Sequence, residues 1–180
     1  DIFDDSQWLI SLVENLLSVT RIEEGRMNFN MSVQLMDEVI DEAMKHINRK
    51  GAEHNIAVEC RDELLLARMD AKLIIQVIIN LVDNAIKYTP AGSDIRITAE
   101  NIDGFVSVSI ADNGKGIPDP MKPRVFEMFY TGDNRIADSR RSLGLGLALC
   151  KSIIHAHGGE ITLTHSGDPR WRLRRCVRRP

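Results

Sequence analysis

The sequence has 180 residues, of which 43% are hydrophobic and 27% are charged, a balance typical of one globular domain with an appendage. No apolar run approaches the roughly 18 residues of a membrane span. The acidic start, Asp1 to Asp5, differs from the basic start of a signal peptide. Three cysteines without CxxC spacing argue against a disulfide framework or a zinc site. We therefore expect a soluble chain from a reducing compartment.

The net charge of −3 hides an uneven distribution along the chain. Six arginines fall between Arg170 and Pro180, and without them 17 basic residues stand against 26 acidic ones. An acidic body disfavours a nucleic-acid-binding domain.

An amphipathic helix is expected from the N-terminus to Gly25, which ends it. Its apolar residues recur with i, i+3, i+4 and i+7 spacing; they are Trp8, Leu9, Leu12, Val13, Leu16 and Leu17. This apolar stripe needs a partner. The helix is either a terminal helix that packs on its own domain or one half of a helical hairpin from a bundle.

Hydrophobic periodicity and turn residues place the remaining elements. The expected elements are strand 27–31, helix 35–48 with Ser32 as a candidate cap, strands 56–60 and 64–69, helix 71–88 capped by Asp70, strands 95–99 and 105–111, a short helix near 120–128, helix 145–157 and strand 160–164. Two antiparallel hairpins are predicted, one through residues 61–63 and one through Asp103-Gly104. This mixture predicts an α+β fold, in which two layers place helices on one face of a mixed sheet. A doubly wound parallel sheet fits less well.

The predicted helix 71–88 carries a polar side as well as an apolar one. Asn80, Asn84, Lys87 and Tyr88 share that side because they follow i, i+4, i+7 and i+8 spacing. Two carboxamides one turn apart suit Mg²⁺, which keeps waters and phosphate oxygens as its other ligands. A lysine one turn further on can meet phosphate as a point charge. The alternative is an ordinary solvated helix face.

The second polar motif, Asp112-Asn113-Gly114-Lys115-Gly116, directly follows a predicted strand. Its alternate glycines permit positive φ and a close approach of the backbone to a ligand. The Asp112 carboxylate could accept a hydrogen bond from an exocyclic amine such as that of adenine. The alternative is a polar turn between strand and loop.

The third motif, Gly144-Leu145-Gly146, opens a predicted helix. Glycines at a helix N-terminus expose backbone N–H groups, and the helix dipole favours phosphate there. The alternative is that glycine only permits tight helix packing.

Four motifs in this order resemble the N, G1, F and G2 boxes of sensor histidine kinases. They are Asn80-x-x-x-Asn84, Asp112-x-Gly114-x-Gly116, Phe126-x-x-Phe129 and Gly144-Leu145-Gly146-Leu147. The resemblance covers about residues 1–165. Segment 13–23 is similar to the end of the second helix of the dimerisation and phosphoacceptor hairpin, and segment 137–147 is similar to the potassium-sensing KdpD-type kinases.

The resemblance implies the Bergerat ATP-binding fold and use of ATP with Mg²⁺. Asn84 would be the main Mg²⁺ ligand, Asn80 would assist it, and Lys87 would meet phosphate. Asp112 would accept from the adenine amine, and Tyr88 would flank the adenine ring. The other residues implied at the nucleotide are Gly114, Gly116, Ile117, Arg140, Arg141, Gly144, Leu145 and Gly146, with 130–143 as a lid.

The residue type at position 80 distinguishes between the possible phosphoryl-transfer mechanisms. ATP-hydrolysing and serine-kinase relatives of this fold carry glutamate four residues before the metal asparagine, where it serves as general base. Asn80 cannot take a proton, which disfavours activation of water or of a serine hydroxyl. Histidine is the natural acceptor because a neutral imidazole is already a nucleophile, and the resemblance implies a protein-histidine kinase. The alternatives are a same-fold ATPase or serine kinase, and a non-catalytic nucleotide-binding module.

The resemblance also implies partners and divides the chain. Residues 1–25 would belong to the hairpin, 26–168 would form the catalytic domain, and 169–180 an atypical Arg-rich tail. The partners would be the phosphoacceptor hairpin of the same kinase, in a homodimer, and a cognate response regulator. The domain would be the cytoplasmic portion of a membrane-anchored bacterial sensor. No nucleic-acid partner is expected.

The sequence departs from the family pattern at several points, among them Ser142, which replaces the first glycine of the last box and which the KdpD-like group tolerates. No histidine lies in the context of the phosphoacceptor; the five are His46, His54, His155, His157 and His165. Thr131 stands where an arginine is common. The tail after residue 168 lacks the expected Gly-rich turn and apolar strand, and our hypothesis is that it is read out of frame. A weak strand around Trp171 and Leu173 is allowed there, and the alternative is a genuine basic arm.

Overall fold

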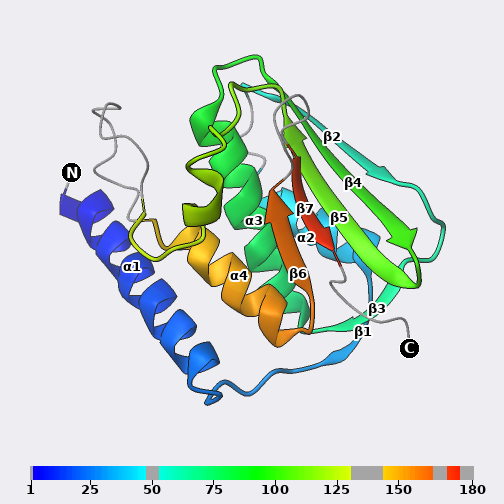
Figure 1. Cartoon of the computed structure of the whole chain (residues 1–180), viewed down its shortest axis with the longest axis horizontal. Helices are drawn as coiled ribbons and strands as arrows, with labels where there is room; N and C mark the ends of the chain where they lie inside the picture. Colours follow the sequence, from blue (N-terminus) through cyan, green and yellow to red (C-terminus); the bar gives the residue numbers. More distant parts are fainter. Residues whose placement is uncertain (1, 48–52, 131–143, 164–169, 175–180) are drawn as a thin grey trace.

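The computed structural model describes residues 2–47, 53–130, 144–163 and 170–174. A five-stranded mixed sheet, in the order β2-β4-β5-β7-β6, forms one layer, and helices α2, α3 and α4 form the other (Figure 1). The elements are α1 (Ile2–Glu23), β1 (Ser32–Leu35), α2 (Met36–Ile47), β2 (Asn55–Cys60), β3 (Leu66–Met69), α3 (Ala71–Tyr88), β4 (Asp94–Ile102), β5 (Phe105–Asp112), the 3₁₀ turn η1 (Lys122–Arg124), α4 (Gly146–Ala156), β6 (Glu160–Leu163) and β7 (Arg170–Arg174). The predicted two-layer α+β fold with helices on one face of a mixed sheet is confirmed.

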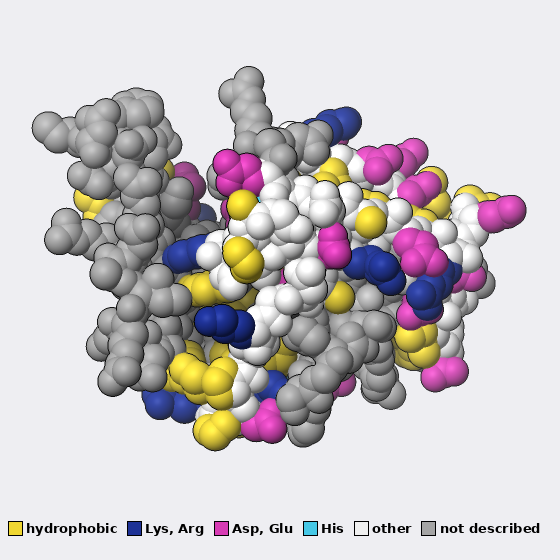
Figure 2. Space-filling model, turned by 90° about the horizontal axis from the view of Figure 1, so that it is seen from above, with side chains coloured by type: hydrophobic (Ala, Val, Ile, Leu, Met, Phe, Trp, Pro, Cys, Tyr) yellow, Lys and Arg dark blue, Asp and Glu magenta, His cyan; other side chains and the backbone are white. Residues whose placement is uncertain are grey.

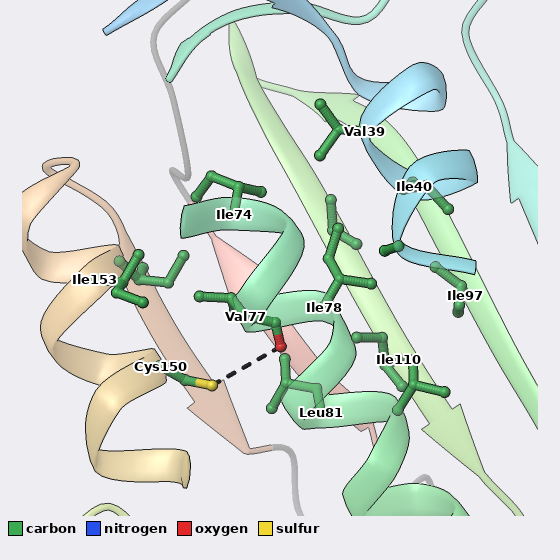
Figure 3. Close-up of a cluster of buried hydrophobic side chains, with 14 of the residues drawn as sticks. Val39, Ile40, Ile74, Val77, Ile78, Leu81, Ile97, Ile110, Cys150 and Ile153 are labelled. Atoms are coloured by element: carbon green, nitrogen blue, oxygen red, sulfur yellow. Dashed lines mark hydrogen bonds between the residues drawn. The ribbon is translucent and has the colours of Figure 1, made fainter. Parts of the chain in front are cut away.

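Helix α3 lies between α2 and α4 and provides the centre of the core (Figure 3). It begins as predicted, because Asp70 accepts a hydrogen bond from Leu73 N at its N-cap. Val77, Ile78 and Leu81 are fully buried on its apolar side. The apolar side therefore fixes α3 against the sheet and leaves its polar side free for a site.

The hairpin of β4 and β5 forms as predicted. The two strands pair antiparallel from Ile95↔Asp112 to Ile102↔Phe105. Asp103 and Gly104 between them have φ of 53° and 82°, the conformation that a type I′ turn requires.

The second predicted hairpin, of strands 56–60 and 64–69, is wrong. β2 pairs parallel with β4 in the main sheet, whereas β3 pairs antiparallel with β1 in a separate two-stranded sheet. Ala67 and Met69 are fully buried, and Met36 N donates to Leu65 O. Burial of these strand residues in the hydrophobic core outweighs the local turn signal of residues 61–63.

Two further elements differ from the prediction. Residues 27–31 form no strand, because Phe29 packs on the core and Asn30 N donates to the Asp70 carboxylate instead of to a strand partner. The strand begins at Ser32, which therefore does not cap α2. The predicted helix near 120–128 is reduced to η1, which contains Pro123, and Phe129 beyond it has φ of 64°. The predicted helix 145–157 is present as α4, and strand 160–164 as β6.

β7 joins β6 to the rest of the main sheet. Its residue Trp171 pairs with Ile110 of β5 and Leu163 of β6, and Leu173 pairs with Val108 and Ile161. The strand allowed around Trp171 and Leu173 is therefore present, although it lies in the segment assigned to the tail. On the face of the molecule drawn in Figure 2, acidic, basic and hydrophobic side chains are interspersed, and the coloured atoms form no continuous basic area.

Helix α1 packs against α4 through its C-terminal half (Figure 1). Val19 is 1% exposed, Ile22 lies against the core, and Gln76 of α3 donates to Asn15 at 3.4 Å. Among the stripe residues whose side chains the structure describes, Leu9, Val13, Leu16 and Leu17 are between 38% and 51% exposed, and the neighbouring Ile10 is 52% exposed. The side chains of Trp8 and Leu12 lie outside the described part of the chain. The helix thus packs on its own domain and still presents an open apolar side. No helix in the described part of the chain is long and apolar enough to cross a membrane.

Candidate functional site

The polar side of α3 meets the N-terminus of α4 at Asn80. A β-carbon built on Gly146 would lie 3.9 Å from Asn80 Cγ, so the first turn of α4 faces this carboxamide. Asn80 Nδ2 is buried and has no hydrogen-bond partner among the residues that the structure describes. Asn84 follows one turn later on the same side and is half-buried. A buried amide without a partner beside a helix N-terminus suits a ligand rich in oxygen.

Cys150 of α4 lies near the Asn80 side chain and is fully buried. Its Sγ contacts Val77 O at 3.8 Å, the bond drawn in Figure 3. Burial raises the pKa of the Cys150 thiol to about 12, and the nearby Asn80 side chain lowers it to a smaller extent. Asn80 Nδ2 has no hydrogen-bond partner in the described part of the chain, so its donor stays available to a ligand. Cys150 is therefore a packing residue, because its reactive thiolate form is suppressed.

Asp112 ends β5 beside the C-terminus of α3. Its Oδ1 accepts from Gly114 N at 2.9 Å. A β-carbon on Gly114 would lie 2.7 Å from both Asp112 Oδ1 and Thr89 Cγ2, so only glycine fits between these side chains. Burial raises the pKa of Asp112, and the Gly114 N–H opposes that shift. Gly116 has φ of 70°, as expected for a loop whose backbone approaches a ligand.

Two cofactor-binding candidates at the end of α3 are exposed. Lys87 Nζ lies 5.3 Å from the centre of the Tyr88 ring, and 53% of Tyr88 is exposed. This cation–π contact keeps the lysine beside the aromatic ring. Ile117, beyond the glycine loop, is half-buried and packs against the core.

The segment before residue 131 and the segment from Gly144 meet closely. Gly144 has φ of 65°, and a β-carbon on it would lie 2.7 Å from Tyr130 N. Arg124 stacks over the Tyr130 ring at 4.6 Å and is paired with Glu127. The two arginine candidates, Arg140 and Arg141, lie outside the described residues.

The structure thus brings three of the four motifs together around α3. Gly146 lies against Asn80, and Gly114 lies against Thr89 at the end of the same helix. Leu145, the N-cap of α4, is buried at 3% exposed. Sequence reasoning missed Thr89 and Arg124. Thr89 directly follows the predicted helix, whereas the Arg124–Tyr130 contact depends on a turn that no spacing rule indicates.

The donor set fits Mg²⁺ better than a transition metal. The described part of the chain holds no group of three or more His, Cys, Asp or Glu residues that could bind a metal ion. Carboxamide oxygens on α3, together with phosphate oxygens, are hard ligands of the kind Mg²⁺ takes.

Comparison with known families decides the assignment of this site. A family model described as "Histidine kinase-, DNA gyrase B-, and HSP90-like ATPase" matches residues 69–174, which include α3, both glycine motifs and β7. The chain belongs to this family. Within it, the chain is the ATP-binding catalytic domain of the sensor histidine kinase type, which confirms the resemblance seen in its motifs.

Relatives within the family agree with this assignment. "Sensor protein KdpD" of Clostridium acetobutylicum is 43% identical over 167 residues, covering 93% of this chain and 19% of that protein. The catalytic domain of histidine kinase ThkA matches with a TM-score of 0.71 at 30% identity, covering 81% of this chain and 94% of that structure. ThkA in complex with response regulator protein TrrA matches with a TM-score of 0.70 at 27% identity, covering 92% of this chain and 48% of that one. The chain therefore spans about a fifth of the length of the first curated relative.

Proposed function

We propose that this domain binds Mg²⁺·ATP and passes its γ-phosphoryl group to a histidine on the phosphoacceptor hairpin of the same kinase. The bond between the γ-phosphorus and the oxygen bridging to the β-phosphate breaks, a bond from phosphorus to an imidazole nitrogen forms, and ADP leaves. The observation that carries the proposal is the partnerless, buried Asn80 amide facing Gly146 at the start of α4.

In this proposal each motif handles one part of the nucleotide. Asn84 and Asn80 hold the metal and the phosphate oxygens, and Lys87 adds a positive charge at the phosphates. Asp112 accepts from the adenine amine, and Tyr88 flanks the ring. When bound, Mg²⁺ neutralises charge on the phosphate oxygens, which is the main requirement of phosphoryl transfer.

The asparagine at position 80 favours histidine as the acceptor of the phosphoryl group. An amide in this position can hold phosphate or metal but cannot remove a proton from water or a hydroxyl group. A neutral imidazole needs no such base. The domain would then act by positioning and charge neutralisation, without general-base chemistry.

The remaining parts of the proposal concern the whole kinase. The exposed stripe of α1 would complete a dimeric hairpin bundle, and a response regulator would take the phosphoryl group onward. A response regulator is bound to ThkA in one of the matching structures, which supports that partner. Membrane anchoring of the full sensor and use of Mg²⁺ belong to the same proposal.

A labelling experiment tests the reaction. The chain is mixed with a separately made hairpin that bears the phosphoacceptor histidine, and γ-labelled Mg²⁺·ATP is added. We expect acid-labile, base-stable label on the hairpin. Free phosphate without label on the hairpin would instead identify an ATPase, and ATP binding without either signal would identify a binding module.

A further inference from the structure

The segment from Gly25 to Met31 connects α1 to the catalytic domain without regular secondary structure. Its course therefore helps to set where α1 lies. Near its start it borders a hollow of about 570 Å³, and Arg26, Met27 and Asn28 are among the residues that line it. Attachment to the domain comes further along, at Phe29 and Asn30.

His157, just after α4, contacts this attachment point. Its Nε2 accepts a hydrogen bond from Asp70 N at 3.1 Å, and its Nδ1 lies 2.8 Å from Ile153 O. Because a backbone carbonyl only accepts and a backbone N–H only donates, both contacts require a neutral imidazole that carries its hydrogen on Nδ1. The Phe29 ring meets the imidazole edge-on, with centroids 5.6 Å apart and planes at 83°.

Asp70 carries the contact from His157 to the connecting segment. Its Oδ2 accepts from Asn30 N at 2.8 Å, and its Oδ1 accepts from Leu73 N at the start of α3. Asp70 is only 8% exposed, so these bonds form away from bulk water. His157 and Asp70 thus join the end of α4, the start of α3 and the segment after α1.

The joint formed by His157, Asp70 and Asn30 lies at the opposite end of α4 from the nucleotide motifs. α4 runs from Gly146 to Ala156, which is about 16 Å along the helix axis. His157 therefore lies away from the proposed nucleotide site. It instead holds the connection between α1 and the two helices whose other ends form the site.

We propose that His157, acting through Asp70, is a positioning residue for phosphoryl transfer, because it fixes α1 and the attached hairpin relative to the ATP site. The inference rests on the proposed kinase function. A misplaced hairpin slows transfer steeply, since small shifts in the position of reacting groups are costly. Nucleotide binding itself does not depend on this joint.

The test uses the kinase that carries this domain together with its phosphoacceptor hairpin. Autophosphorylation is measured over a range of ATP concentrations for the wild type, His157→Leu, His157→Gln and the matched control His155→Leu. His155 is an exposed residue on the same helix end. Glutamine keeps an acceptor for Asp70 N, whereas leucine removes it.

For His157→Leu we expect kcat to fall about tenfold or more while KM for ATP stays within about twofold. His157→Gln should recover most of the rate, and His155→Leu should match the wild type. Hydrogen-exchange mass spectrometry should show faster exchange of the Asn30 amide in His157→Leu. The reason is that Asp70, whose carboxylate accepts from Asn30 N, loses the hydrogen bond from its own N–H to His157.

Three results separate the possible failures. An unchanged kcat in His157→Leu overturns the positioning role. A parallel loss of kcat and ATP affinity also overturns it, since it identifies a purely structural residue. Absence of transfer in the wild type overturns the proposed function, and Asn30 exchange then reports on the joint independently.

Discussion

Gly144 lies directly against the backbone of Tyr130, so the segments on either side of residues 131–143 are in contact. A β-carbon at Gly144 would sit 2.7 Å from Tyr130 N, and the residue has φ of 65°. Both facts demand glycine, the first through steric exclusion and the second through backbone conformation. The start of α4 is thereby held against the segment that follows η1.

Gly144→Ala should weaken ATP binding by about tenfold or more, because the added methyl group forces Tyr130 and the start of α4 apart. The matched control is Gly158→Ala, at the other end of α4. Gly158 has φ of 71° but open space around its would-be β-carbon. The Gly158→Ala variant should lose about 1 kcal/mol of stability and keep the ATP affinity of the wild type. Isothermal titration and thermal unfolding measure both effects, and equal ATP affinities in the two variants would contradict the prediction.

Asn84→Ala should abolish the Mg²⁺ dependence of ATP binding, because the variant loses the proposed main metal ligand. Lys72→Ala, on an exposed position in the first turn of the same helix, serves as control and should bind normally. The measurement is ATP affinity with and without Mg²⁺. Unchanged affinity of Asn84→Ala in Mg²⁺ would refute the assignment of this residue.

ATP affinity should fall on acidification at a higher pH than an ordinary aspartate would produce. Burial raises the pKa of Asp112 above its usual value, and only the ionised carboxylate accepts from the adenine amine without a competing proton. Affinity is therefore full above the raised pKa of Asp112 and is lost as pH falls through it. In Asp112→Asn this pH step should disappear. A step of equal size in the variant would assign it to another group.

The same raised pKa has a consequence for the free domain. The folded state binds the Asp112 proton more tightly than the unfolded state does. The contribution of Asp112 to stability therefore decreases as pH rises from its ordinary pKa through its raised pKa. Chemical unfolding of the wild type and Asp112→Asn over this pH range would measure the difference.

Removal of β7 should destabilise the domain far more than removal of the residues beyond it. β7 pairs with β5 on one side and β6 on the other, so deletion of 170–180 breaks the sheet and separates β6 from it. Deletion of 175–180 alone leaves every described strand intact. We expect cooperative unfolding to persist only in the shorter deletion. Similar unfolding curves for both deletions would show that β7 contributes little.

These deletions also bear on the origin of the Arg-rich end. The pairing of Trp171 and Leu173 with β5 and β6 shows a strand here, whether or not the segment is in frame. Sequencing of the source gene tests the reading frame directly, and an in-frame match to this exact end would exclude our hypothesis of a frame error.

The sequence was most informative where the pattern is local. The apolar period of 71–88 and the Asp70 cap predicted α3 to the residue, and Asp103-Gly104 predicted the β4–β5 turn. The order of the four motifs predicted the family. The assignment of individual site residues remains a prediction, supported by the contacts of Asn80 with Gly146 and of Asp112 with Gly114.

Only the tertiary structure decided which distant segments meet. The period of a strand does not state its partner, so β3 was assigned to β2 although it pairs with β1. Asp70 and His157 are 87 residues apart, and neither is marked by spacing as the other's partner. Local patterns are set by the few residues of one turn or one pleat. Pairings across the chain depend instead on which apolar surfaces are buried together once the whole core has formed.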